Sequence, residues 1–158
     1  MVFVIKIMRL DERLIHGQVA LSWTKDYNIH IVLIVNDNIV NDAFLKMTLG
    51  LAKPPGVELK IVSVEEGIEL IKQYETTSNN VMVIVNNTMD VKRIVENTNI
   101  KSVNFGNLSE RTNSKRISNS VTLTPEDIEI CKELIDKGIE LEIRWVANDK
   151  KQLIKNLI

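Results

Sequence analysis

The fold is decided by the stretch HIVLIV at residues 30–35, a short and almost wholly apolar run, together with the similar run VMVIV at residues 81–85. Strands that are covered on both faces of a sheet give continuous runs of Val, Ile and Leu rather than an alternation with polar residues. Helix-length amphipathic stretches separate these runs, and this arrangement indicates βαβ units. We therefore predict an α/β fold with an open, twisted, mainly parallel sheet and helices on both faces, a three-layer and Rossmann-like arrangement.

The same pattern extends outward along the whole chain. We predict strands near Val2–Met8, His30–Val35, Glu58–Val62, Val81–Val85, Ser102–Phe105 and Glu140–Trp145. We predict helices over about Leu14–Lys25, Asp42–Ala52 and Asp149–Leu157, and two more that begin after Ser63 and Thr124. Ser63 precedes Glu66 by three positions, and Thr124 precedes Pro125 and Asp127; both patterns are typical of helix N-termini. The apolar face of the last predicted helix is compatible with a homodimer.

Size and composition limit the functions that the chain can have. With 158 residues, of which 44% are hydrophobic, one domain over residues 1–158 is expected. The 20 basic residues are matched by 21 acidic ones, so a broad positive surface for nucleic acid is excluded. The single Cys131 predicts a reducing compartment, and the short apolar start at residues 1–8 is not a membrane span. We expect a cytoplasmic protein that does not insert into the membrane and that needs no metal or cofactor.

The segment RLDERLIHGQV, residues 9–19, carries the chemistry. It lies between the first predicted strand and the first predicted helix, where open α/β sheets bind their ligands. Arg9 and Arg13 can present planar forks of N–H donors to a phosphate, and a helix N-terminus adds to this attraction. Asp11 can orient an arginine or an imidazole through a hydrogen bond. The segment is therefore a candidate anion site.

His16 adds a function that simple anion binding does not require. A neutral imidazole is nucleophilic near pH 7 without a strong base, so His16 can accept a phosphoryl group directly. Arg9 and Arg13 would then stabilise the charge on the transferred group, and Gly17 would leave room for a partner's catalytic residue. The residues alone leave two other interpretations open, namely a structural histidine and a solvated cluster of ion pairs.

Other polar positions carry weaker signals. His30 lies within a predicted strand and is interpreted as structural. The pairs at residues 36–37 and 86–87 follow predicted strands, where turn chemistry explains them as well as binding does. The stretch NFGN at residues 104–107 can line the same crevice as His16 but is not a nucleotide-binding fingerprint. A nucleotide-binding protein is therefore a weak alternative.

The sequence resembles the IIB component of the mannose/fructose/sorbose family of the phosphoenolpyruvate-dependent sugar phosphotransferase system. Residues 9–19 are similar to the family segment R-[IL]-D-x-R-L-I-H-G-Q-V, in which the histidine is phosphorylated. Further matches along nearly the whole chain are IVND at 34–37 with ND at 41–42, AKPPGV at 52–57, NFGNL at 104–108 and ELEIR at 140–144. The resemblance implies that His16 takes a phosphoryl group, on its Nδ1 atom, from a phosphohistidine of a IIA domain. It then passes the group to a sugar held by IIC and IID membrane subunits.

The resemblance also implies a second set of site residues and a set of partners. Gly17, Asn104, Gly106 and Asn107 would border the site, and the polar loop of residues 107–120 would follow it. The family often has Gly-[RK]-Thr-Gln in this loop, where this chain has ERTN at 110–113; Arg111 and Thr112 then correspond to the phosphate or partner positions. Because the chain begins at its first strand, the IIA donor is expected on another polypeptide, or on a cleaved or separately expressed domain. A regulatory module that senses phosphorylation without delivering phosphate to sugar is the alternative, and the sugar itself is not defined.

Overall fold

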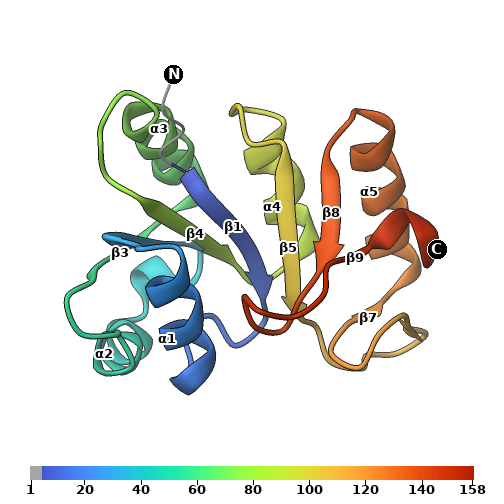
Figure 1. The fold of residues 1–158 in the computed structure, drawn as a ribbon, viewed down its shortest axis with the longest axis horizontal. Helices are drawn as coiled ribbons and strands as arrows, with labels where there is room; N and C mark the ends of the chain where they lie inside the picture. The colour runs from blue at the N-terminus through green and yellow to red at the C-terminus, as the bar shows by residue number, and fades with distance from the viewer. Residues whose placement is uncertain (1–4) are drawn as a thin grey trace.

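The computed structural model describes residues 5–158, which form one twisted sheet with helices on both sides (Figure 1). The strands of this sheet are β1 (Ile5–Asp11), β2 (Ile31–Val35), β3 (Glu58–Val62), β4 (Val81–Val85), β5 (Ser102–Asn107), β8 (Glu140–Ile143) and β9 (Gln152–Leu153). Their order is β3-β2-β4-β1-β5-β8-β9, and every pairing is parallel except that of β8 with β9. The predicted mainly parallel α/β sheet is confirmed. Residues 2–4 of the first predicted strand lie outside the described residues.

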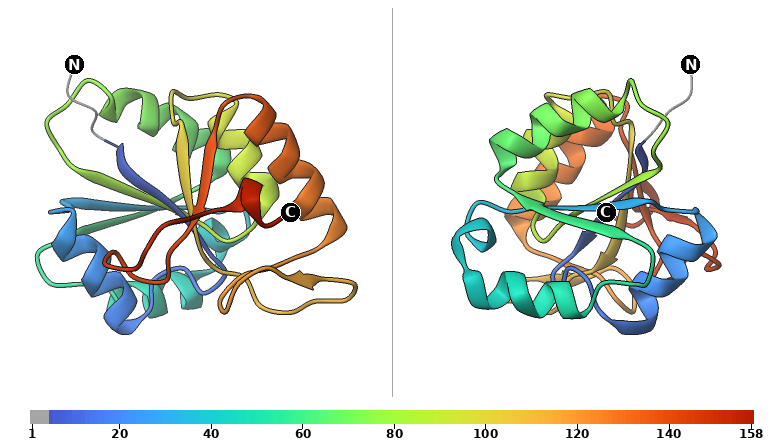
Figure 2. Two further views of the ribbon diagram at one scale, coloured as in Figure 1. Left: turned by 45° about the vertical axis from the view of Figure 1, so that its right-hand side comes forward. Right: turned by 90° about the vertical axis from the view of Figure 1, so that its left-hand side faces the viewer.

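The helices divide between the two faces of the sheet, as the two views in Figure 2 show. One face carries α1 (Gly17–Asp26) and α2 (Ala43–Leu51), and the other carries α3 (Val64–Tyr74), α4 (Thr88–Val95) and α5 (Pro125–Asp136). Short 3-10 turns, η1 (Ile39–Asn41) and η2 (Ile154–Asn156), and a small hairpin of β6 (Lys115–Arg116) and β7 (Thr122–Leu123) complete the fold.

Successive residues of each strand face opposite sides of the sheet, and this places two cores on its two faces. In β2, Leu33 and Val35 pack in the core beneath α3, α4 and α5, whereas Val32 and Ile34 pack in the core beneath α1 and α2. All five residues of β2 and of β4 are buried. This burial on both faces explains why these strands are continuous apolar runs in the sequence.

The two predicted caps are present. The Ser63 side chain accepts a hydrogen bond from the Glu66 N–H (3.2 Å) at the start of α3. At the start of α5, Thr124 and Asp127 form a reciprocal capping box and Pro125 occupies the first helical position. Such caps satisfy N–H groups that the helix itself leaves without acceptors.

One predicted helix boundary and one whole predicted helix are wrong. The first helix begins at Gly17 rather than near Leu14, because Leu14 has a positive φ of 60° that no α-helix accommodates. The predicted helix over residues 149–157 does not form. Residues 152–153 instead pair with the open edge of β8, and Ile154 is buried against the core. The apolar helix face that suggested a homodimer is therefore absent.

Within residues 5–158, no helix is both long enough and apolar enough to cross a membrane.

Candidate functional site

The candidate site lies beyond the carboxyl ends of β1 and β5, which are neighbours in the sheet. After β1 the chain enters α1 on one face, whereas after β5 it leads to α5 on the other face. Because the two connections leave in opposite directions, the loops open a crevice at this point, and such crevices bind ligands in open α/β sheets. The loop of residues 12–16 that carries His16 lies in this crevice.

The face of the sheet that α1 covers changes from apolar to polar at the same strands. Along β1, β5 and β8 the inward positions on this face are Arg9, Asn104 and Glu142, each 1% exposed or less. Buried charges are costly unless they are paired and hydrogen-bonded, so this layer must be a connected network.

Asp11 is the link between this buried layer and His16. Its side chain is fully buried, and its Oδ2 atom accepts hydrogen bonds from Arg9 (Nη2, 3.1 Å) and lies 2.9 Å from His16 Nε2. Its Oδ1 atom accepts the backbone N–H of Arg13 at 2.9 Å. An ionised carboxylate can only accept hydrogen bonds, so the proton of a neutral His16 ring lies on Nε2. The lone pair on Nδ1 is then free to react with an electrophile.

The predicted role of Arg9 as a direct phosphate contact is wrong, because its guanidinium is buried within the network. Besides Asp11, it donates hydrogen bonds to the Asn104 side chain (2.7 Å) and to the Arg144 carbonyl (3.1 Å), and it lies 5.2 Å from the ring centre of Trp23. Burial lowers the pKa of Arg9 from its ordinary value, whereas Asp11 opposes this change. Arg9 therefore holds the Asp11 carboxylate in place rather than reaching a ligand.

Asn104 and Glu142 extend the network away from His16. The predicted site residue Asn104 therefore connects buried charged groups and does not border the site. The Asn104 amide donates to Glu142 (3.2 Å), and Arg144 donates to both Glu142 oxygens (2.9–3.2 Å). Although burial opposes the charge, the bonds to Glu142 and Tyr27 raise the pKa of Arg144 above its ordinary value. The charges of Arg9, Asp11, Glu142 and Arg144 sum to zero.

Gly106 is required because Arg9 occupies the space where a side chain would begin. A Cβ atom at this position would overlap the Arg9 guanidinium carbon and both of its terminal nitrogens. The predicted site residue Gly106 thus acts by leaving room for Arg9.

We expect Gly106→Ala to lower the free energy of unfolding by about 1–3 kcal/mol, the usual cost of overpacking a well-packed interior. Gly50→Ala is the matched control, because Gly50 lies in α2 with no atom near its missing Cβ, and it should be neutral or slightly stabilising. Urea denaturation of both variants measures the difference. Equal stability of the two variants would show that Arg9 has room to move.

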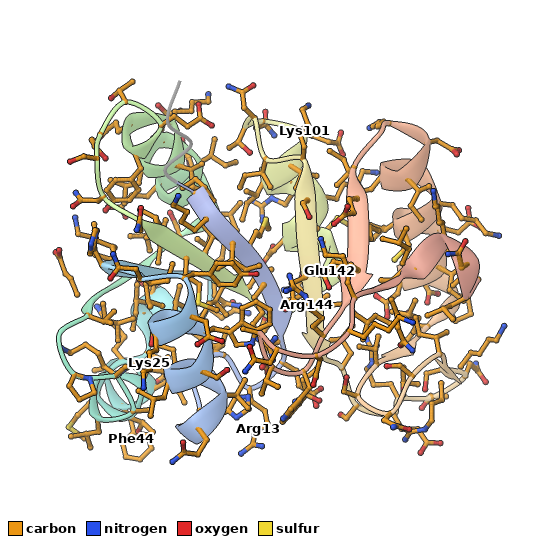
Figure 3. All side chains as sticks on the ribbon, in the orientation of Figure 1. Arg13, Lys25, Phe44, Lys101, Glu142 and Arg144 are labelled. Atoms are coloured by element: carbon orange, nitrogen blue, oxygen red, sulfur yellow. The ribbon has the colours of Figure 1, made fainter. Side chains whose placement is uncertain are left out.

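Arg13 and Gly17 are the predicted site residues that reach the surface. Arg13 extends past the end of β1 into solvent (Figure 3), and within residues 5–158 its guanidinium has no hydrogen-bond or ion-pair partner. Gly17 is exposed with a φ of +43°, and it begins α1 directly after His16. The His16 side chain is 14% exposed, so an incoming group can reach it. Within residues 9–19, Arg13, His16 and Gly17 are thus the candidate site residues with surface exposure, and α1 begins directly after His16.

The loop of residues 107–120 divides between the site and α5. Its start is tied to the segment before His16, because the Asn107 carbonyl accepts the Glu12 N–H (3.0 Å) and Ser109 donates to the Glu12 carboxylate (2.9 Å). The Arg111 guanidinium instead pairs with Asp127 at the start of α5 (2.8 Å) and donates to the Thr122 carbonyl. Thr112 is exposed. Arg111 thus fastens the loop to α5, although its side chain is still 40% exposed.

The weaker sequence signals are accounted for by local structure. His30 Nδ1 accepts the backbone N–H of Asn80 (3.0 Å), in line with a structural role. Asn36 accepts backbone N–H groups of the following 3-10 turn, and Asn87 caps α4. Burial raises the pKa of the Cys131 thiol to about 12, so this cysteine stays protonated in the core.

Sequence reasoning missed the aromatic residues of the site. Trp23 is fully buried, and its ring lies close to both Arg9 and Arg144 (5.2 and 4.9 Å to the ring centre). Its indole N–H donates to the carbonyl of Trp145 (3.1 Å), and the Trp145 ring lies 5.6 Å from the His16 ring. The available signal was the scarcity of aromatic residues, since the chain has only two tryptophans and both are here.

An open, mainly parallel α/β sheet with a carboxylate-bound histidine beyond the end of β1 defines the fold and the candidate site of this class of domain. The chain belongs to the sorbose subfamily of IIB components of the phosphotransferase system, since the model of this family matches residues 5–158.

Individual relatives agree with this family. The chain is 34% identical over 146 residues to the sorbose-specific EIIB component of Klebsiella pneumoniae. This alignment covers 92% of this chain and 89% of that protein. It is also 38% identical over 156 residues to the mannose-specific EIIAB component of Escherichia coli K12. This alignment covers 98% of this chain but only 48% of that protein. The chain thus spans about half the length of the mannose-specific relatives. The crystal structure of the sorbose permease IIB domain of K. pneumoniae superposes with a TM-score of 0.88 at 34% identity, covering 96% of this chain and 94% of that one.

Proposed function

We propose that the chain carries a phosphoryl group on Nδ1 of His16, taking it from a phosphorylated IIA protein or domain and delivering it to a sugar. The observation that carries this proposal is the contact of 2.9 Å between Asp11 Oδ2 and His16 Nε2, which leaves Nδ1 as the ring nitrogen with a free lone pair. Membership of the IIB family supports the same assignment.

The transfer forms one bond and breaks one bond. The Nδ1 lone pair of His16 attacks the phosphorus, and the bond between phosphorus and the donor's imidazole nitrogen breaks, with its electron pair returning to that nitrogen. His16 keeps its proton on Nε2, so its ring gains positive charge as the new bond forms, and the Asp11 carboxylate stabilises this charge. In the second transfer a sugar hydroxyl oxygen attacks the same phosphorus, the bond to Nδ1 breaks with its electron pair returning to Nδ1, and the hydroxyl proton passes to a base of the acceptor complex or to solvent.

The groups around His16 would stabilise the phosphoryl oxygens during both transfers. The exposed Arg13 guanidinium offers two parallel N–H donors. The first-turn N–H groups of α1 have no acceptor within the helix, and the N-cap residue His16 makes no side-chain hydrogen bond to them. The acceptor complex would be the IIC and IID membrane subunits, which the chain meets at the cytoplasmic side. The relatives are named for different sugars, including mannose, sorbose and fructose, so the proposal covers the carrier step common to them.

Two assays test the proposal in sequence. With phosphoenolpyruvate, the general phosphotransferase proteins and a IIA donor, the chain should gain one acid-labile, alkali-stable phosphoryl group that His16→Ala abolishes. Membranes that contain the cognate IIC and IID should then phosphorylate sugar only when the intact chain is added. Phosphorylation without sugar phosphate would favour a regulatory module instead.

We expect Arg13→Ala to slow phosphoryl acceptance by about tenfold to a hundredfold, because an exposed cation next to the transferred group is lost. Stability should change by less than about 0.5 kcal/mol, since the Arg13 side chain is exposed and makes no ion pair within residues 5–158. Lys101→Ala is the matched control, because Lys101 is exposed just before β5, at the opposite end of the strands from Arg13 (Figure 3). Quench-flow kinetics with phospho-IIA would contradict this role if both variants matched the wild type.

A further inference from the structure

The contact between His16 and Asp11 fixes one atom of the imidazole but not the plane of its ring. The ring can still turn about its Cβ–Cγ bond, and because this axis passes close to Nε2, a single hydrogen bond at Nε2 restrains the plane of the ring only weakly. Reaction requires the Nδ1 lone pair to point at the phosphorus, because phosphoryl transfer needs the attacking and leaving atoms nearly in line. A second contact is therefore needed to orient the ring.

Trp145 supplies that contact. Its ring centre lies 5.6 Å from that of His16 at an interplanar angle of 48°, a separation typical of packed aromatic pairs. Trp145 follows β8 in the sequence, so the contact comes from a different part of the fold than Asp11 in β1.

The backbone of Trp145 is itself held firmly. Its carbonyl accepts the indole N–H of the fully buried Trp23 (3.1 Å), and its N–H donates to the Asp149 carboxylate (3.1 Å), which also accepts the N–H of Val146. Trp145 is half-buried, and beyond it lies an open hollow of about 570 Å³ between residues 143–152 and the loop of residues 107–120. Both polar backbone groups of Trp145 are therefore hydrogen-bonded, and this fixes the point from which its ring contacts His16.

We propose that Trp145 is a positioning residue that, together with Asp11, fixes the plane of the His16 ring so that Nδ1 faces the incoming phosphoryl group. The π face of an indole also attracts a cation, so it favours the ring as positive charge develops on it. The inference deepens the proposed function and rests on it for its kinetic consequence, whereas its structural consequence is measurable without any phosphoryl donor.

The structural test uses the full chain labelled with ¹⁵N in its histidine rings, which gives only two imidazoles, His16 and His30. In the wild type we expect His16 to show one tautomer with the proton on Nε2. Trp145→Leu should give averaged His16 ring shifts, while Trp145→Phe should retain the wild-type pattern. His30 serves as the internal reference, because its Nδ1 accepts a backbone N–H elsewhere in the fold.

The kinetic test measures phosphoryl transfer from phospho-IIA. Trp145→Leu should slow transfer by about fivefold or more, and Trp145→Phe should restore most of the rate because it keeps an aromatic face. If Trp145→Leu does not fold, tryptophan fluorescence is compared between the wild type and Trp145→Phe instead. Phosphorylation should then change the fluorescence of the wild type but not that of Trp145→Phe. Wild-type ring shifts and rate in a folded Trp145→Leu variant, or identical fluorescence changes in wild type and Trp145→Phe, would overturn the inference. Averaged His16 ring shifts in Trp145→Leu, found together with a wild-type chain that no donor phosphorylates, would uphold the positioning role and reject the proposed function.

Discussion

Asp11→Asn is expected to slow phosphoryl transfer to the chain by about a hundredfold or more, the scale on which a buried carboxylate controls the tautomer of a reactive histidine. An amide can turn its oxygen toward Arg9 and its NH₂ group toward His16. The NH₂ group is a donor, so His16 Nε2 would become the acceptor and the ring proton would move to Nδ1. The lone pair that attacks phosphorus would then be lost, although His16 itself is unchanged.

The measurement is a single-turnover rate with phospho-IIA, corrected for the folded fraction. The correction matters because Arg9 would lose its buried partner, and breaking a buried ion pair costs about 3–5 kcal/mol. Glu12→Gln is the matched control, since the neighbouring Glu12 is more exposed and accepts a hydrogen bond from Ser109. A folded Asp11→Asn variant that transfers as fast as Glu12→Gln would refute the orienting role of Asp11.

Glu142→Gln is expected to lower the free energy of unfolding by about 3 kcal/mol, because Arg144 would keep its charge without a countercharge. The Glu142 side chain is 1% exposed and accepts from Arg144 and Asn104. Neutralising Glu142 also leaves the buried layer with a net positive charge. We therefore expect the hydrogen bonds around Asp11, at the other end of the network, to weaken.

The matched control comes from the same strand. Glu140 lies two residues before Glu142, but its side chain is 41% exposed where it pairs with Lys151. Exposed ion pairs contribute about 0–1 kcal/mol, so Glu140→Gln should be nearly neutral. Chemical denaturation of the two variants gives the comparison directly, and a cost for Glu140→Gln as large as for Glu142→Gln would contradict a special role for the buried network.

The sheet could be predicted because its central strands are buried on both faces and therefore leave continuous apolar runs in the sequence. The starts of α3 and α5 were predictable for a different reason, since the caps at Ser63 and Thr124 act within four residues. Both signals are local, and local signals are visible in a sequence.

The C-terminal segment could not be predicted in the same way. The spacing of Leu153, Ile154 and Leu157 fits a helix, but the free edge of β8 offers hydrogen-bond partners to residues 152–153. This competition depends on which strand lies at the edge of the sheet, and that is a property of the topology rather than of the segment.

The candidate site was predicted in part. The motif at residues 9–19 predicts His16 and Asp11, because both residues lie close together in the sequence where β1 leads into α1. Arg9 was misassigned because the sequence does not show that its side chain points into a layer covered by α1. Glu142 and Trp145 are distant in sequence from His16, and only the adjacency of β1, β5 and β8 brings them to the site.

The central claim is that Asp11 holds Nε2 of His16 and leaves Nδ1 to accept the phosphoryl group. The most direct test is nuclear magnetic resonance of the ¹⁵N-histidine-labelled chain after incubation with a phospho-IIA donor that is known to phosphorylate a related IIB component. The account predicts one phosphoryl group, bonded to Nδ1 of His16, with His30 unchanged. A phosphoryl group on Nε2, on another residue, or on none would contradict it.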